Sequence, residues 1–252
     1  KKIFKDVAKE KKNFLLDINN LIKREKKLYL KPNVKRVGIY NEFWNTYGGG
    51  EKRALDFIYE LKLSDYCIDL ISSNDFDINN LKKYFNHNNL RLRKRIINIT
   101  LQNISSEYDI FINTTYLSNL ISFAKKSFYL ISFPQKKATQ EFLNSYTFVP
   151  NSKYTLNWAT KYWGKNFDSK LIYPKLDFDQ KNLAKIYNKK KIILSVGRWS
   201  PLGHSKKQFE MAQMFNQLTK NKKFQNWSFV LVGSLNEKNS IEVKYYNKVK
   251  SY

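Results

Sequence analysis

Short apolar runs alternate with longer amphipathic stretches from Val34 to the end of the chain, and this alternation restricts the fold more than any other feature. Several short runs, such as 110–112 and 128–131, are almost entirely apolar. Strands of this kind are covered by helices on both faces, as in parallel sheets. The regular exchange of strand and helix patterns therefore predicts an α/β fold with a doubly wound parallel sheet.

The alternation indicates two successive units joined by a polar stretch at 177–191. In the first unit we expect strands at 35–40, 66–72, 109–113, 127–133, 147–149 and 170–173, and helices at 51–63, 78–98, 117–125 and 152–163. In the second we expect strands at 192–196 and 229–232 and helices at 206–219 and 241–249. We divide the chain into a Rossmann-like N-terminal domain at 33–180 and the first part of a second Rossmann-like domain at 181–252. The second is too short for an independent sheet, so we expect it to be truncated or to pack on the first.

Residues 1–32 form a separate Lys-rich segment with apolar residues at helical spacing. The spacing predicts one basic amphipathic N-terminal helix. Such a helix could lie on a membrane surface. We favour packing of its apolar stripe on its own domain, because that is what a core-facing stripe usually does.

The formal net charge is +25, from 46 basic and 21 acidic residues. A basic chain suits nucleic acid, an anionic membrane or substrates that carry phosphate. However, the chain is also rich in Lys, Asn, Ile, Phe and Tyr, the residues of A/T-rich codons, so genome composition alone could produce the charge. The charge therefore selects no partner by itself.

A single cysteine, Cys67, leaves no internal disulfide framework and no C-x-x-C zinc pattern. The sequence contains no apolar run of about 18 residues, and its first residues lack the apolar core of a signal peptide. These features predict a cytoplasmic protein.

Three consecutive glycines, Gly48, Gly49 and Gly50, follow the first predicted strand and precede a helix. Bare backbone N–H groups at a helix N-terminus favour phosphate, and open α/β sheets bind ligands at the carboxyl ends of their strands. The spacing matches neither G-x-G-x-x-G nor the Walker loop. We interpret the loop as a ligand loop, with a flexible connection as the alternative. Glu51 lies at the cleft or caps its own helix.

A second site is predicted in ILSVGRWSPLGHSKKQFEMAQMF at 193–215. A strand ends at Gly197 and Arg198, and the following loop carries His204, Lys206 and Lys207. Arginine offers a planar fork and lysine a mobile point charge, so the pair suits a diphosphate. The alternative is a set of solvated cations.

These segments resemble glycosyltransferase family 4. The family's donor-phosphate motif is similar to SVGRW…GHSKKQFEMAQMF, and the strand after that motif is similar to FVLVGS. Its glycine-rich loop and first helix are similar to GGGEKRALDFI. The end of its N-terminal domain is similar to FVPNSKYTLNWATKYWG with LIYPKLD. Arg198 matches the motif Arg and Lys206 the motif Lys, with Lys207 as the alternative register. The resemblance covers about 35–250, and its nearest members are mannosyltransferases of lipid-linked oligosaccharide and enzymes of bacterial polysaccharide assembly.

The resemblance implies a GT-B fold and transfer of a hexose from a nucleotide-diphosphate sugar, with retention and without a metal or cofactor. Arg198 and Lys206 would be the catalytic residues, because fixed positive charge stabilises the leaving diphosphate. Gly48–Gly50, Gly197, His204 and Lys207 would bind the donor. Glu51, Ser132 and Asp177 would lie on the acceptor side, with a glycan or lipid-linked acceptor at the cytoplasmic membrane face. GDP-mannose is the first donor candidate and a UDP-sugar the alternative.

Two departures from the family pattern concern the site. Ser132 stands where near relatives carry a histidine, and the paired-glutamate motif is expected beyond Tyr252, so we expect no turnover from this chain alone. No His/Asp/Glu cluster suggests a metal. Asp75-Phe76-Asp77 spells D-x-D, but we interpret it as a polar surface turn, because carboxylates are mostly exposed. His87 is expected to be exposed.

Two non-enzymatic functions remain as alternatives. A nucleic-acid binder could use the positive charge with 17 Tyr and 18 Phe. We expect no nucleic acid, because most aromatics fall in the predicted core and no RNA-binding signature occurs. A membrane-surface scaffold could use 1–32.

Overall fold

A computed structural model describes residues 35–60, 66–97, 101–175, 189–202, 205–237 and 239–252. The chain divides into two compact units, Lys1–Leu176 and Asp177–Tyr252. The predicted N-terminal helix at 1–32, Asp177 and His204 lie outside the described residues. Each unit is described by itself.

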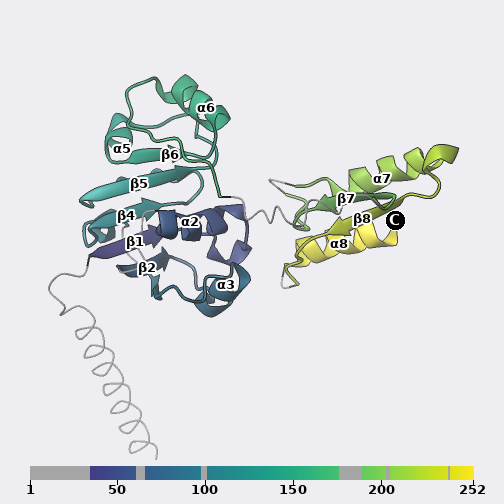
Figure 1. Ribbon diagram of the computed structural model, residues 1–252, viewed down its shortest axis with the longest axis horizontal. Helices are drawn as coiled ribbons and strands as arrows, with labels where there is room; N and C mark the ends of the chain where they lie inside the picture. The colour runs from purple at the N-terminus through teal and green to yellow at the C-terminus, as the bar shows by residue number, and fades with distance from the viewer. Residues whose placement is uncertain (1–34, 61–65, 98–100, 176–188, 203–204, 238) are drawn as a thin grey trace, which may run out of the picture. The chain divides into compact units, whose positions relative to one another are not determined.

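The N-terminal unit is built on a six-stranded, fully parallel sheet (Figure 1). Its strand order is β3-β2-β1-β4-β5-β6. The strands are β1 (Arg36–Tyr40), β2 (Cys67–Ser72), β3 (Leu92–Ile96), β4 (Ile110–Asn113), β5 (Lys126–Ile131) and β6 (Thr147–Pro150). The order reverses between β1 and β4, and this is the Rossmann-like arrangement in which ligands bind at the reversal point. The α/β fold with a parallel sheet is thus confirmed.

Helices pack on both faces of this sheet, and Figure 1 shows α2 lying across one of them. They are η1 (Trp44–Thr46), α2 (Gly49–Glu60), α3 (Ile78–Tyr84), α4 (Leu101–Ser105), α5 (Gln140–Asn144) and α6 (Lys153–Trp163). Three begin at side-chain caps, because Asp77, Thr139 and Ser152 accept hydrogen bonds from backbone N–H groups of the first turn. These caps set the points where the chain turns back over the sheet.

Two apolar clusters fill the two faces. Alternate residues of β1 divide between them: Val37 and Ile39 join the cluster that contains residues of α2 and α3, and Tyr40 joins the cluster that contains residues of α5 and α6. This alternation follows from the two-residue period of a strand. A sheet buried on both faces explains why its central strands read as continuous apolar runs.

The predicted helix at 78–98 is wrong over its second half. Helix α3 ends at Tyr84, Asn86 adopts a left-handed conformation with φ 58°, and 92–96 forms the edge strand β3. Asn tolerates this conformation better than most residues, so it ends the helix. The strand was missed because it reads LRKRI, and charges on an edge strand hide its apolar period.

Two further expectations differ from the structure. The segment 117–125 is not helical, and Leu117, at its start, has a φ of 58°, outside the helical region. The predicted strand at 170–173 is an extended segment beside β6 rather than a strand. Its backbone still bonds β6, with Lys170 N donating to Phe148 O at 2.8 Å.

The C-terminal unit contains a parallel pair, β7 (Ile192–Val196) and β8 (Ser228–Val232), with α7 (Gln208–Thr219), η3 (Lys222–Phe224) and α8 (Ser240–Ser251). The predicted strand–helix–strand–helix pattern is confirmed here, although α7 begins at Gln208 rather than at Lys206. Little of this unit is buried, and Leu194 and Val196 of β7 are 60% and 67% exposed.

Within the described parts of both units, every helix is too short or too polar to cross a lipid bilayer.

Candidate functional site

The two glycines that follow β7 and β8 bring the ends of these strands into close contact. Gly197 N donates to Val232 O at 2.8 Å, and Trp199 N donates to Ser234 O at 3.2 Å, so the backbone pairing continues past the strands. A Cβ added at Gly233 would overlap the carbonyl oxygen of Gly197. Glycine at 233 is therefore a steric requirement, and it sets the direction in which the chain leaves β7.

The loop after Gly197 returns and places the stem of Lys206 against this glycine. A Cβ added at Gly197 would lie 3.1 Å from Lys206 Cβ and still closer to its Cγ. Arg198 follows directly, and the side chains of Arg198, Lys206 and Lys207 are exposed. Four of the residues predicted for the donor site thus lie at the carboxyl end of β7.

Helix α7 begins beside these cations. Lys207 is its N-cap residue, with a left-handed φ of 58°, and Lys207 Nζ lies 3.5 Å from Glu210 Oε1. Backbone N–H groups of a first helical turn carry partial positive charge. Exposed cations and a helix N-terminus at the end of a parallel strand form a site suited to an anion.

Sequence reasoning missed Gln208, which ties this loop to α7. Its side chain is 2% exposed, and its Nε2 donates to Arg198 O at 2.7 Å and to Gly197 O at 3.3 Å. The hydroxyl of Tyr245 in α8 donates to Gln208 Oε1 at 3.5 Å. Gln208 therefore holds the strand end in position, and only its place after two lysines could have suggested this role.

In the N-terminal unit, Glu51 organises the glycine loop at the reversal point of the sheet. Its side chain is 5% exposed. Oε2 accepts from Gly48 N at 2.8 Å and from Thr46 Oγ1 at 2.6 Å, and Oε1 accepts from Asn41 Nδ2 at 3.0 Å. Both carboxylate oxygens accept hydrogen bonds within the loop, so Glu51 supports the loop and caps α2.

Neither packing nor backbone conformation requires glycine at Gly49 or Gly50. Both are exposed at the start of α2, neither has a positive φ, and no described atom lies within 4 Å of a Cβ built at either position. Glycine is needed where a partner must approach bare backbone. The open space at these two residues is what a ligand loop requires.

Glu42 joins the carboxyl ends of β1 and β2 next to this loop. Its carboxylate accepts from Ser73 N, Ser73 Oγ, Ser72 Oγ and Asn74 Nδ2 at 2.6–3.2 Å. Burial raises the pKa of this carboxyl, but the hydrogen bonds from Ser73, Tyr40 and Ser72 outweigh burial and lower it. Glu42 therefore stays ionised and fixes the two loops to each other.

Two further polar residues of α2 were not predicted. Arg53 is 9% exposed and donates to Ile131 O at 3.1 Å and to Val149 O at 3.0 Å, at the carboxyl ends of β5 and β6. Asp56 contacts His87, with Oδ1 3.1 Å from Nε2. His87 is 8% exposed, so the expectation of an exposed histidine is wrong, because the turn after α3 packs it on α2.

Two further features named from the sequence are Ser132 and the D-x-D sequence at 75–77. Ser132 is exposed directly after β5, and its carbonyl accepts from Asn151 Nδ2 and Thr155 Oγ1, both at 3.2 Å. In the D-x-D sequence, Asp77 caps α3 and Asp75 Oδ1 accepts from Lys94 Nζ at 2.8 Å, while Phe76 is buried. The turn is therefore anchored rather than purely a surface feature.

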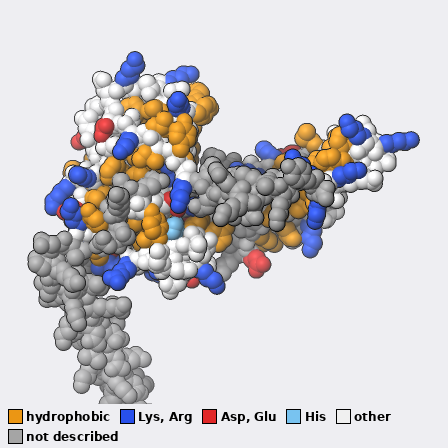
Figure 2. Space-filling view, in the orientation of Figure 1, with side chains coloured by type: hydrophobic (Ala, Val, Ile, Leu, Met, Phe, Trp, Pro, Cys, Tyr) orange, Lys and Arg blue, Asp and Glu red, His pale blue; other side chains and the backbone are white. Residues whose placement is uncertain are grey.

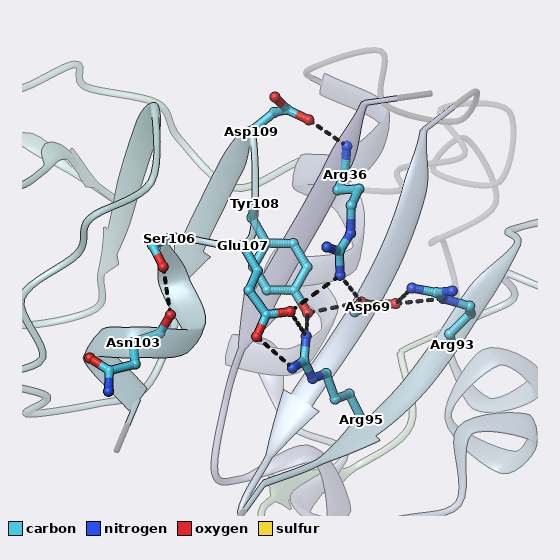
Figure 3. Close-up of polar contacts among 9 residues, drawn as sticks. All are labelled: Arg36, Asp69, Arg93, Arg95, Asn103, Ser106, Glu107, Tyr108 and Asp109. Carbon is cyan, nitrogen blue, oxygen red and sulfur yellow. Dashed lines mark hydrogen bonds and ion pairs between the residues drawn. The ribbon is translucent and has the colours of Figure 1, made fainter. Parts of the chain in front are cut away.

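A polar cluster lies near the amino ends of β1 and β4 and extends to β2 and β3 (Figure 3). Asp69 is 3% exposed and accepts from Arg93 Nε at 2.6 Å and from Tyr108 Oη at 2.8 Å. Arg95 Nη1 and Nη2 each donate to Glu107 at 2.9 Å. These charged and polar side chains hydrogen-bond to one another across β2, β3 and the start of β4. The cluster therefore has a structural role.

Comparisons with known proteins add no family assignment: no family model matches the chain, and no curated protein matches it. In the described ranges, no three His, Cys, Asp or Glu side chains are close enough together to hold a metal ion.

Proposed function

We propose that this chain is part of a retaining glycosyltransferase of the GT-B type that moves a hexose from a nucleotide-diphosphate sugar to a glycan or lipid-linked acceptor. The N-terminal unit would be the acceptor-side domain, and the C-terminal unit the start of the donor-binding domain. The observation that carries the proposal is the stem of Lys206 lying against Gly197, next to Arg198, at the carboxyl end of β7. Two cations from opposite ends of one loop thus lie beside the N-terminus of α7.

Glycosyl transfer breaks the bond between the anomeric carbon and the leaving diphosphate, and negative charge grows on the diphosphate. Fixed positive charge favours this transition state more than the ground state. In the proposed mechanism Arg198 donates two parallel hydrogen bonds to a phosphate, Lys206 adds a mobile charge, and the first N–H groups of α7 add further donors. Gln208 contributes indirectly, because its hydrogen bonds to the carbonyls of Gly197 and Arg198 fix the start of the loop.

The finer assignments follow from the resemblance described above. GDP-mannose is the first donor to test and a UDP-sugar the second. The acceptor would be met at the cytoplasmic membrane face, and Gly49 and Gly50, with open space over both glycines, would approach a substrate in the N-terminal unit. Turnover would also require the paired glutamates by which this family holds the donor sugar and ribose.

Binding rather than turnover therefore tests the proposal. Calorimetric titration of the 252-residue chain with GDP, UDP, GDP-mannose and UDP-glucose should show saturable binding of one nucleotide class. A charge-assisted hydrogen bond contributes about 1.5–3 kcal/mol. Arg198→Gln and Lys206→Gln should therefore each weaken binding roughly 10–100-fold, since every 1.4 kcal/mol is about tenfold.

Matched controls come from the same unit. Lys220→Gln and Lys222→Gln remove exposed charges beyond the C-terminal end of α7 and should leave binding unchanged. Equal weakening by all four substitutions would show that only overall charge matters. Salt-sensitive binding of an oligonucleotide, without saturable binding of any nucleotide diphosphate, would favour a nucleic-acid binder and sink the proposal.

A further inference from the structure

Helix α6 carries a row of aromatic side chains on one side. Tyr154, Trp158 and Tyr162 follow one another at intervals of four residues, with ring centroids 6.3 and 5.2 Å apart. Phe133, from the loop after β5, adds a fourth ring, 6.3 Å from Tyr154 and 6.0 Å from Trp158. We call these four residues the aromatic face of α6.

This aromatic face is not part of the core. Tyr154 is 64% exposed, and the other three rings are partly buried. None of the four belongs to either apolar cluster of the sheet. These aromatic side chains therefore keep apolar area exposed to solvent that a partner could cover.

The segment that carries these rings is rich in exposed lysines. Residues 133–175 contain seven lysines and two acidic residues, and all nine are exposed. Lys161 Nζ lies 4.5 Å from the ring centroid of Trp158, and Lys153 begins the helix. Figure 2 shows hydrophobic side chains gathered over α6 with Lys and Arg side chains around them.

We propose that the aromatic face of α6, with its rim of lysines, is a docking surface for an anionic lipid bilayer. Tyr and Trp rings, which have one apolar and one polar end, suit the headgroup region of a membrane. Lysines bury their stems along apolar surface and direct their charge to anionic headgroups. The surface is independent of the nucleotide-diphosphate site, which lies in the other unit.

The excess of lysines over acidic residues in 133–175 favours a membrane over a soluble glycan as the partner. Sugar hydroxyls need both donors and acceptors, whereas lysine offers only donors. The rings of α6 also contact one another at tilted angles of 50° and 65°, so they do not form the single flat platform on which a sugar ring would stack. Seven lysines against two carboxylates complement a negative surface instead.

The test compares two triple variants of the full chain that remove the same charge and one exposed tyrosine each. The α6 variant is Lys153→Gln, Tyr154→Ser and Lys161→Gln. The control is Lys82→Gln, Lys83→Gln and Tyr84→Ser on α3, where Tyr84 is 62% exposed. Binding is measured by cosedimentation with vesicles of phosphatidylcholine alone and with added phosphatidylglycerol. The α6 variant should lose about fivefold in affinity for each lysine removed, since a lysine near an anionic surface contributes about 1 kcal/mol.

A site-specific probe keeps the test independent of residues 1–34. In a Cys67→Ser background, an environment-sensitive fluorophore on Tyr154→Cys should shift to the blue with anionic vesicles, and the same label on Tyr84→Cys should not. Equal loss of binding in both triple variants, an unshifted label at 154, or equal binding to neutral vesicles would overturn the proposal. A shift with a soluble oligosaccharide but none with vesicles would overturn it in favour of a glycan surface.

Discussion

Gly38→Ala adds one methyl group to the centre of β1, where the sheet has no room for it. The new Cβ would lie 2.8 and 2.9 Å from two ring carbons of Tyr108 and 3.0 Å from Ile71 Cδ1. The ring cannot move freely, because Tyr108 is 2% exposed and its hydroxyl donates to Asp69 and accepts from Arg95, both at 2.8 Å. Either the ring moves and these bonds lengthen, or the strand shifts.

Gly38→Ala changes the free energy of unfolding through three contributions of known size. Overpacking a core costs about 1–3 kcal/mol, and weakening a hydrogen bond to a charged group costs about 1.5–3 kcal/mol. Replacing Gly by Ala restricts the unfolded chain, which offsets roughly 0.4–1 kcal/mol. We expect Gly38→Ala to destabilise the N-terminal unit by about 2–5 kcal/mol. Gly49→Ala meets no described atom within 4 Å and should instead stabilise by about 0.4–1 kcal/mol.

Native-state hydrogen exchange of the β1 amides, followed by mass spectrometry, measures this difference without assuming that both units unfold together. Tyr108→Leu provides a second check. It removes the ring, so Gly38→Ala should cost less in that background than in the parent chain. If Gly38→Ala proved as harmless as Gly49→Ala, or cost the same with and without the Tyr108 ring, the steric argument would be refuted.

Three further predictions concern individual contacts. Arg53→Met should destabilise the N-terminal unit by at least about 2 kcal/mol in hydrogen exchange, because it leaves buried carbonyls at the ends of β5 and β6 without their donor. Gly233→Ala should abolish both nucleotide binding and the near-UV circular dichroism of the C-terminal unit, since its Cβ would overlap the backbone of Gly197; a normal spectrum would contradict this. The ion pair with Arg95 holds the pKa of Glu107 below its usual range, so its contribution to stability is present above about pH 4.3 and is lost as the pH falls through the lowered value. Glu107→Gln should therefore flatten the acid limb of the stability curve, and an unchanged acid limb would show that the pair contributes nothing.

Much of the fold could be predicted because it depends on local patterns. A strand buried on both faces is apolar at most positions, so the apolar runs in β1, β4 and β5 stand out in the sequence. A glycine followed by an arginine at the end of an apolar run is equally visible, and this pattern identified the loop after β7. These signals need only near neighbours along the chain.

Other features depend on partners far away in the sequence. The basic run LRKRI becomes a strand because β2 pairs with it and Asp69 neutralises Arg93 across the pair. Asn- and Lys-rich sequence around it has no apolar period that could reveal this. The sequence allows Glu51 to lie at the cleft or to cap its helix, and the folded loop shows the capping contact, in which Gly48 N donates to Glu51 Oε2.

Local sequence patterns were enough to predict the alternation of strands and helices, the parallel sheet and the positions of two glycine-containing loops, because apolar periodicity and glycine content are local properties. The burial and the contacts of the polar residues became visible in the folded protein alone: Arg53 binds two strand ends, Gln208 binds the loop after β7, and His87 contacts Asp56. A buried polar group must find its partner wherever the fold supplies one. That partner is set by the packing of distant segments, which no local pattern specifies.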